Sequence, residues 1–326
     1  MRTKTNILLL FLLQFLLTTS VVFAQCDSAA KAIILAQDTS IPVKIRIKQS
    51  LEIIDKAITH PQAQNNAFAW YVRGFIYKEW YKTFELQNKK SSTRLNAVGF
   101  FKKALEMDTF HENPITITQT INYFGKIGTV FLEMNPSTIR HMIKYLGVTF
   151  YNDASSLLDT TNYPAAIQNY EEFKKCILIA EPEYNIKTRE IEFKNALATV
   201  YEKIFRANIK TNERFFGMIE DLYKHVLALD TNNWSGNYNL AMLYYNYGVD
   251  IINKMDLEIP IMEVDKIQDE SRDLFRKALP YAMKSYSLNP KRKEVIMSLQ
   301  GIYFSLYEFE KSDEFKAKLG EIEKEK

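Results

Sequence analysis

Residues 237–250 read NYNLAMLYYNYGVD, and residues 278–290 of the same 326-residue chain read ALPYAMKSYSLNP. In the first segment a large residue, Leu240, precedes a small one, Ala241, and an aromatic residue, Tyr244, follows three positions later. These residues share one face if the segment is helical. In the second segment alanines recur four residues apart before an Asn-Pro pair, which is typical of a helix end. The segments therefore predict two amphipathic helices that pack closely, because the small residue lets the partner helix approach.

The same pattern recurs along the chain, which makes internal repetition its strongest feature. Copies of the first helix are Trp70…Gly74…Tyr77, Leu146-Gly147…Phe150 and Leu197-Ala198…Tyr201. Copies of the second helix are Ala97…Phe101…Ala104, Ala166…Tyr170…Phe173 and Ile219…Tyr223…Val226. The repeated pattern resembles the tetratricopeptide repeat, a helix–turn–helix unit of about 34 residues. The resemblance implies an all-α fold, a right-handed α-solenoid of antiparallel helix pairs, with about five to six units and long insertions.

The resemblance also divides the chain into segments. Residues 25–62 are interpreted as an N-terminal partial helical unit, and residues 63–326 as the repeat array. The units of the array span about residues 66–109, 138–182, 192–231, 235–290 and 291–326. In the long gap between Tyr244 and Ala278, residues 254–260 predict a loop or extended corner, because Pro260 ends any helix there. The charged end from Lys316 to Lys326 predicts a segment that frays or acts as a solubilising end cap.

The stretch from Pro114 to Met134 fits no unit of the repeat. Its Thr116-Ile117-Thr118 segment is rich in β-branched residues, which favour strands. Its larger apolar residues nevertheless recur at helical spacing, at Ile121, Phe124, Ile127 and Phe131. This spacing predicts a helix that breaks the register of the repeat.

The N-terminus has the features of a secretory signal peptide over residues 1–24. Two basic residues provide a positive start, an apolar run follows, and Val22-Phe23-Ala24 offers a cleavage site before Gln25. We therefore expect the protein to be exported, and to be periplasmic or associated with the cell envelope. One alternative is that the segment is retained as a membrane anchor. Another is lipidation of Cys26, although Gln25 stands where a lipobox has a small residue.

The remaining composition excludes several classes of function. The formal net charge is +3 and falls to +1 once Arg2 and Lys4 are removed, so no strong basic excess indicates nucleic-acid binding. Only 10 Gly and 9 Pro occur, which argues against a turn-rich β architecture. The four His are scattered, and the sequence has no Gly-rich phosphate loop, Cys-x-x-Cys pair or nucleophile elbow. We expect no catalytic residues, no metal and no cofactor, and we expect Cys176 to be a small buried apolar residue.

In tetratricopeptide arrays the first helices line a concave groove. The resemblance places the groove-facing positions two and one before, and two and five after, the large residue of each Leu-Gly type pair. Carried onto this sequence, the groove or partner-binding candidates are Tyr71, Phe75, Lys78, Lys144, Tyr145, Tyr151, Asn195, Tyr238, Asn239 and Tyr245. The same positions include Val72, Val148, Ala196, Thr199, Glu202 and Met242. Aromatic rings, amides and Lys suit an extended peptide, and the rings could also stack on sugars. The opposing interpretation is that these rings pack between repeats.

These features predict a non-enzymatic scaffold or adaptor of the cell envelope that holds a protein or peptide in the concave groove. An alternative is a glycan- or nutrient-binding helical-repeat protein of an outer-membrane uptake system, which a lipidated Cys26 would favour. An enzyme on a helical scaffold is a third hypothesis, and it would need clustered acids in a deep pocket. The expected partner is a protein or peptide and not a nucleic acid. Membrane association is expected only through that partner or through Cys26.

Overall fold

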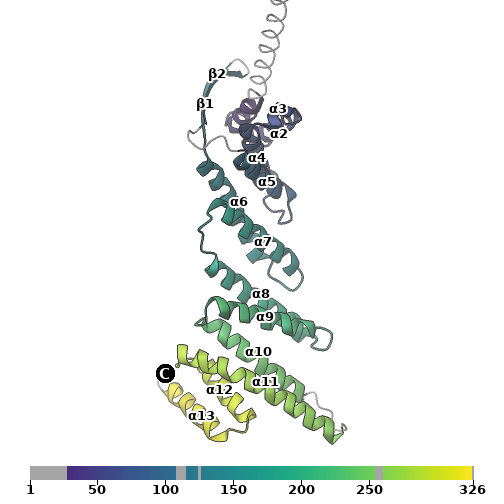
Figure 1. The fold of residues 1–326 in the computed structure, drawn as a ribbon, viewed down its shortest axis with the longest axis vertical. Helices are drawn as coiled ribbons and strands as arrows, with labels where there is room; N and C mark the ends of the chain where they lie inside the picture. Colours follow the sequence, from purple (N-terminus) through teal and green to yellow (C-terminus); the bar gives the residue numbers. More distant parts are fainter. Residues whose placement is uncertain (1–27, 108–114, 124–125, 254–259, 325–326) are drawn as a thin grey trace, which may run out of the picture. The chain divides into compact units, whose positions relative to one another are not determined.

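The computed structural model describes residues 28–107, 115–123, 126–253 and 260–324 (Figure 1). The predicted signal peptide, its cleavage site and Cys26 lie outside these residues. Within the described part of the chain, no helix combines the length and the apolar character that a membrane crossing requires.

The described residues fall into two compact units. The first unit contains the chain up to Leu157 together with Pro164–Tyr184, and the second contains Leu158–Tyr163 together with the chain from Asn185 onward. Each unit is built mainly from consecutive helices, and in the first unit a two-stranded hairpin interrupts the series.

The first unit begins with a helix over residues 28–37 and continues as a series of helix pairs. Its further helices are α2 (Val43–Ala57), α3 (Pro61–Gln64), α4 (Ala67–Trp80), the π-helical turn η1 (Tyr81–Glu85), α5 (Ser92–Glu106), α6 (Pro136–Ser156) and α7 (Tyr163–Ala180). Asparagine side chains start two of them: Asn66 Oδ1 accepts a hydrogen bond from the Ala69 amide at 3.1 Å, and Asn135 Oδ1 accepts one from the Thr138 amide at 2.7 Å. These bonds satisfy amide groups that a helix N-terminus otherwise leaves without an acceptor.

The core of the α4–α5 pair explains the small residue of the repeat pattern. Gly74 on α4 faces the Phe101 ring on α5, and a Cβ added to Gly74 would lie 2.8 Å from that ring. Phe101, Ala97 and Ala104 on α5 are fully buried. The glycine therefore allows a bulky ring to fill the space between two closely packed helices.

Between α5 and α6 the prediction was wrong. Residues Ile115–Tyr123 (β1) and Lys126–Met134 (β2) form an antiparallel two-stranded hairpin, with Ile115 opposite Met134 and Tyr123 opposite Lys126. The described residues of this stretch form no helix. The β-branched residues that crowd this stretch lose side-chain freedom in a helix and suit a strand. The helical spacing of four larger residues did not outweigh this preference.

The second unit consists of three helix pairs. They are α8 (Lys187–Ala207) with α9 (Arg214–Leu229), α10 (Trp234–Asn253) with α11 (Ile261–Leu288), and α12 (Lys293–Ser305) with α13 (Phe309–Lys324). Leu240, Ala241 and Tyr244 are buried on α10, and Ala278 and Ala282 are buried on the facing helix α11. The segments quoted at the outset therefore pack as expected. The predicted helical-repeat, all-α fold class is confirmed, with the β1–β2 hairpin as an insertion in it.

The long gap between Tyr244 and Ala278 consists largely of helix. The first helix, α10, continues to Asn253, and the second, α11, begins at Ile261 (Figure 1). Pro260 stands immediately before α11 and so starts a helix where we expected it to end one; a proline suits that position because no backbone N–H is needed there. Residues 254–259 of the predicted loop lie outside the described chain. At the C-terminus, α13 continues through the charged segment to Lys324.

Candidate functional site

Three of the groove candidates meet between α4 and α6 of the first unit. The Lys78 ammonium lies 4.6 Å from the centre of the Phe75 ring and 6.0 Å from that of Tyr145. Lys78 is buried and forms an ion pair with Glu79 at 2.7 Å. Burial lowers the pKa of the Lys78 ammonium, although the hydrogen bond and charge of Glu79 oppose the shift. Contacts between a cation and aromatic faces partly replace the water that Lys78 loses.

Next to this cluster, α6 presents apolar side chains to solvent. Tyr145 is 37% exposed and Val148 is 44% exposed. A second ammonium, that of Lys82, lies 5.9 Å from the centre of the Tyr145 ring. Lys82 also contacts the Glu79 carboxylate at 3.4 Å, so two ammonium groups share one carboxylate. The surface defined by Phe75, Lys78, Lys82, Tyr145 and Val148 is called the α4–α6 surface below.

Other candidates of the first unit are engaged in packing. Tyr71 is buried against Phe101, with ring centres 6.1 Å apart, and Val72 is fully buried. The Tyr151 ring lies 5.0 Å from the ring of Phe173 on α7. For Tyr71 and Tyr151 the structure therefore supports packing between helices, because the second helices of the pairs supply their aromatic partners. Lys144 forms an ion pair with Glu181 at the end of α7.

In the second unit, groove candidates on α8 and α10 surround a buried tyrosine of α9. The Tyr223 hydroxyl donates a hydrogen bond to Glu202 Oε1 at 2.9 Å. Burial, and then the neighbouring Glu202 carboxylate, raise the pKa of Tyr223, and interactions with Thr199 and Asn239 oppose the rise. Burial also raises the pKa of Glu202. Among the described residues, the buried Asn195 Oδ1 has no hydrogen-bond partner.

The remaining two candidates of α10 differ in their surroundings. Tyr238 stacks on Trp234, with ring centres 5.0 Å apart and planes 10° apart. The Arg292 guanidinium lies over the Trp234 ring, 4.0 Å from its centre. The Tyr245 ring packs against the Phe275 ring, with the ring centres 5.6 Å apart. The Tyr245 hydroxyl occupies the space that a Cβ atom would fill if Gly301 were a larger residue. Tyr245 therefore fills the contact between α10 and α12, whereas Tyr238 belongs to a half-buried aromatic stack.

Two further residues at groove-facing positions were missed. Counted from Leu299 on α12, Met297 stands two residues before and Phe304 five residues after. They are 57% and 61% exposed. The Phe304 ring also packs against the Phe309 ring, with the ring centres 5.5 Å apart. The signal was present in the sequence, because Leu299 lies within the last predicted unit, residues 291–326, and the groove positions can be counted from it in the same way.

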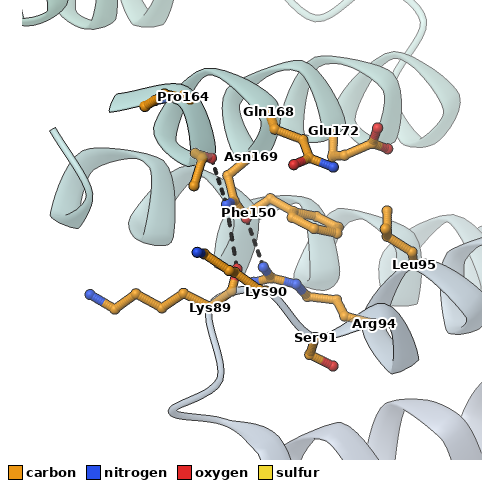
Figure 2. A pocket seen from close by; sticks show the side chains of 11 residues that line it. Lys89, Lys90, Ser91, Arg94, Leu95, Phe150, Pro164, Gln168, Asn169 and Glu172 are labelled. Atoms are coloured by element: carbon orange, nitrogen blue, oxygen red, sulfur yellow. Dashed lines mark hydrogen bonds between the residues drawn. The ribbon is translucent and has the colours of Figure 1, made fainter. Parts of the chain in front are cut away.

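A pocket of about 300 Å³ lies between α5 and the pair α6–α7, outside the predicted groove positions (Figure 2). Its wall includes Lys89, Lys90, Arg94, Phe150, Asn169 and Glu172. Figure 2 shows the Asn169 side chain reaching toward Arg94 and Lys89. Its amide nitrogen donates to the carbonyl oxygens of Ala165 at 2.9 Å and Lys89 at 3.4 Å.

Arg94 is the largest fully buried side chain described, and it joins α5 to both following helices. Its Nη1 donates to Asp153 Oδ2 at 2.7 Å, and its Nη2 donates to Asn169 Oδ1 at 2.8 Å. The guanidinium also stacks on Phe150, 3.7 Å from the ring centre. A buried charge must be paired and hydrogen-bonded to be tolerated. Sequence patterns gave no signal for Arg94, because its partners lie 59 and 75 residues further along the chain.

Within the described ranges, no group of three His, Cys, Asp or Glu side chains is placed to hold a metal ion. The single described ion pair of a histidine joins His225 to Glu190, at 3.2 Å on the partly exposed surface of α8 and α9. Burial raises the pKa of the Cys176 thiol to about 12, so this side chain is a poor nucleophile at neutral pH.

No family model matches the chain, and no curated protein matches it. Similar solved structures include YrrB, described as a TPR protein with an unusual peptide-binding site (14% identity, 82% of this chain and 91% of that chain, TM-score 0.29). They also include the S. pombe nuclear import adaptor Nro1 (10% identity, 92% and 94%, TM-score 0.32) and the TPR2AB domain of yeast Sti1 in a complex with pHSP90 (11% identity, 94% and 92%, TM-score 0.26). These TM-scores are low, and the fold assignment rests on the helix pairs themselves.

Proposed function

We propose that this tetratricopeptide-like chain is a non-enzymatic scaffold that binds a protein or peptide through the groove-facing side of its first helices. The observation that carries the proposal is the exposure of apolar side chains at these positions. Tyr145 and Val148 on α6, and Met297 and Phe304 on α12, are between 37% and 61% exposed. Single exposed apolar residues are common on protein surfaces, but these four all stand at groove-facing positions, two counted from Leu146 and two counted from Leu299, and apolar side chains exposed together on one face indicate an interaction surface.

The chemistry of the α4–α6 surface indicates what a bound segment would carry. Two ammonium groups, of Lys78 and Lys82, share the single carboxylate of Glu79. One positive charge is therefore left over beside the exposed Tyr145 ring. An extended peptide with an acidic residue next to an apolar one would match this arrangement, because the acid meets the ammonium groups while the apolar side chain covers the ring.

The setting that we propose is the cell envelope. The support for it is the positively charged, apolar N-terminal segment and the cleavage site before Gln25. In such a setting the protein would hold its partner after both had been exported.

The proposal is tested with peptides selected by the purified mature protein from a random library displayed on phage. Two serine pairs replace groove-facing residues, Tyr145→Ser with Val148→Ser and Met297→Ser with Phe304→Ser. The matched control replaces equally exposed residues of second helices, Leu178→Ser on α7 with Met218→Ser on α9. We expect at least one groove pair to weaken peptide binding about tenfold, which is typical of truncating an apolar anchor, and the control pair to leave it unchanged.

Two outcomes would contradict the proposal. Failure to select any peptide would do so, as would peptides whose affinity neither groove pair alters. Binding of a glycan that is lost in the same groove variants would replace the proposal with the glycan-binding alternative. Circular dichroism of each variant verifies that the helices are retained, since exposed substitutions of this kind usually change stability by less than about 0.5 kcal/mol.

A further inference from the structure

We propose that the pocket lined by Arg94 is a second binding site, separate from the groove-facing residues, and that it takes the carboxylate group of a small acid with an apolar stem. The pocket lies where the start of α5 meets α7, and it is lined by residues 89–91 just before α5, by α5 and α7 themselves, and by Phe150 of α6. Its volume of about 300 Å³ is at the lower end of the range for small-molecule sites.

The hydrogen bonding of Arg94 is incomplete. A guanidinium has five N–H bonds. The Nη1 atom of Arg94 donates to the oxygens of Tyr81, Thr149 and Asp153, and Nη2 donates to Asn169 Oδ1. The buried Nε atom has no acceptor among the described residues. The Nε–H and one Nη2–H bond thus remain. Together they are the pair of donors that binds the two oxygens of a carboxylate side by side.

Positive charge exceeds negative charge around the pocket. The lining contains three cationic side chains, Lys89, Lys90 and Arg94, and one carboxylate, Glu172. Glu172 already pairs with Lys175 at 2.8 Å. Asp153 balances one charge, that of Arg94, while the Lys89 ammonium is bound to the neutral Ser156 hydroxyl at 2.7 Å. The pocket therefore retains positive charge, which favours an anionic occupant.

The apolar part of the pocket lining selects among anions. Leu95, Phe150, Pro164 and Ala165 contribute hydrocarbon surface to the same pocket. Phosphate would leave that surface against a strongly hydrated group, whereas a branched alkyl chain attached to a carboxylate would cover it. The pocket accordingly suits an acid such as 4-methylpentanoate better than inorganic phosphate.

The test uses saturation-transfer NMR on the full-length mature protein with 4-methylpentanoate as the probe. A probe of this size is expected to bind with a dissociation constant of about 1 mM. Its neutral amide, 4-methylpentanamide, and inorganic phosphate serve as comparison probes. Acetyl-alanyl-leucine and its C-terminal amide show whether the carboxylate is accepted at a peptide end or only in a free acid.

Two surface variants keep the test independent of Arg94, whose replacement endangers folding. Ala165→Leu fills the pocket and is expected to abolish the signal of the probe. Lys90→Gln removes an exposed charge and is expected to weaken binding about threefold. The matched control is Lys102→Gln, an exposed lysine elsewhere on α5, and it should leave binding unchanged.

The proposal is overturned if the amide or phosphate binds as well as the acid, if no probe gives a signal, or if Ala165→Leu leaves the signal intact. The groove variants with Tyr145→Ser and Val148→Ser should not alter binding of the probe. Failure of peptide binding at the groove would therefore leave this inference standing, and loss of the pocket signal would leave the scaffold proposal standing.

Discussion

Gly147 on α6 provides a quantitative test of how the helix pairs pack. A Cβ added at this position would lie 2.9 Å from the Cβ of Cys176 on α7. That atom is fixed to the α7 backbone, so no change of rotamer relieves the contact and the two helices must separate. Replacing a glycine by alanine within a helix otherwise stabilises it by about 1 kcal/mol. Packing an extra methyl group into a filled core costs about 1–3 kcal/mol.

We therefore expect Gly147→Ala to lower the free energy of unfolding by about 1 kcal/mol, and by no more than about 2 kcal/mol, because the steric cost exceeds the gain in helix propensity. Gly99→Ala on α5 is the matched control, since no atom lies within 4 Å of the added Cβ. That variant should be stabilised by about 0.5–1 kcal/mol. The measurement is the midpoint of urea unfolding, followed by circular dichroism for both variants.

A second substitution identifies the contact responsible. Cys176→Ala keeps the Cβ and should not relieve the cost of Gly147→Ala, whereas Cys176→Gly removes the contacting atom and should relieve part of it. The comparison is a double-mutant cycle, in which Gly147→Ala is expected to couple with Cys176→Gly but not with Cys176→Ala. The reasoning is refuted if Gly147→Ala stabilises the protein as much as Gly99→Ala does, or if Cys176→Ala restores stability.

Three further predictions concern titration, reactivity and processing. Glu202→Gln should be more stable than the wild type at neutral pH, and the difference should shrink as pH falls toward the ordinary Glu value. The reason is that burial raises the pKa of Glu202 in the folded protein, so the stabilisation that comes from its protonated form is present at low pH and is lost as pH rises through the raised pKa. Urea unfolding at several pH values tests this, and a constant difference in stability between Glu202→Gln and the wild type would contradict it. In a chain that carries Cys26→Ser, Cys176 should react with a thiol reagent at neutral pH only after denaturation, because burial raises its pKa to about 12. Rapid reaction of that variant in its native state would contradict the buried position of Cys176. Intact mass of the exported protein should correspond to a chain that begins at Gln25, and a mass that includes residues 1–24 or a lipid on Cys26 would reject the proposed cleavage.

The helix pairs could be predicted because their determinants are local. The spacing of Leu240, Ala241 and Tyr244, and of the alanines on α11, is fixed by the helical period alone, and the structure buries these residues as expected. The β1–β2 hairpin was missed because two local signals disagreed there. Apolar spacing favoured a helix, the density of β-branched residues favoured a strand, and the strand preference prevailed.

The candidate site was less accessible to prediction, because exposure depends on which neighbouring helix covers a position. Tyr71 and Tyr145 occupy groove-facing positions in neighbouring units, yet the first is buried against Phe101 and the second is exposed. Arg94 could not be found at all, since its role depends on contacts to Asp153 and Asn169 that only the tertiary structure creates. Local patterns determine helices, whereas long-range packing determines which side chains remain available to a ligand.

The central claim is that a protein partner contacts the groove-facing side of the first helices. The most direct test places a photo-crosslinking benzoylphenylalanine at Val148 on α6 or at Leu178 on α7, residues that are 44% and 45% exposed. Both proteins are irradiated in cells of the organism that encodes the chain, with and without Tyr145→Ser. The account predicts a polypeptide adduct at position 148 that Tyr145→Ser diminishes, and none at position 178. No adduct at 148, or equal adducts at both positions, would contradict it.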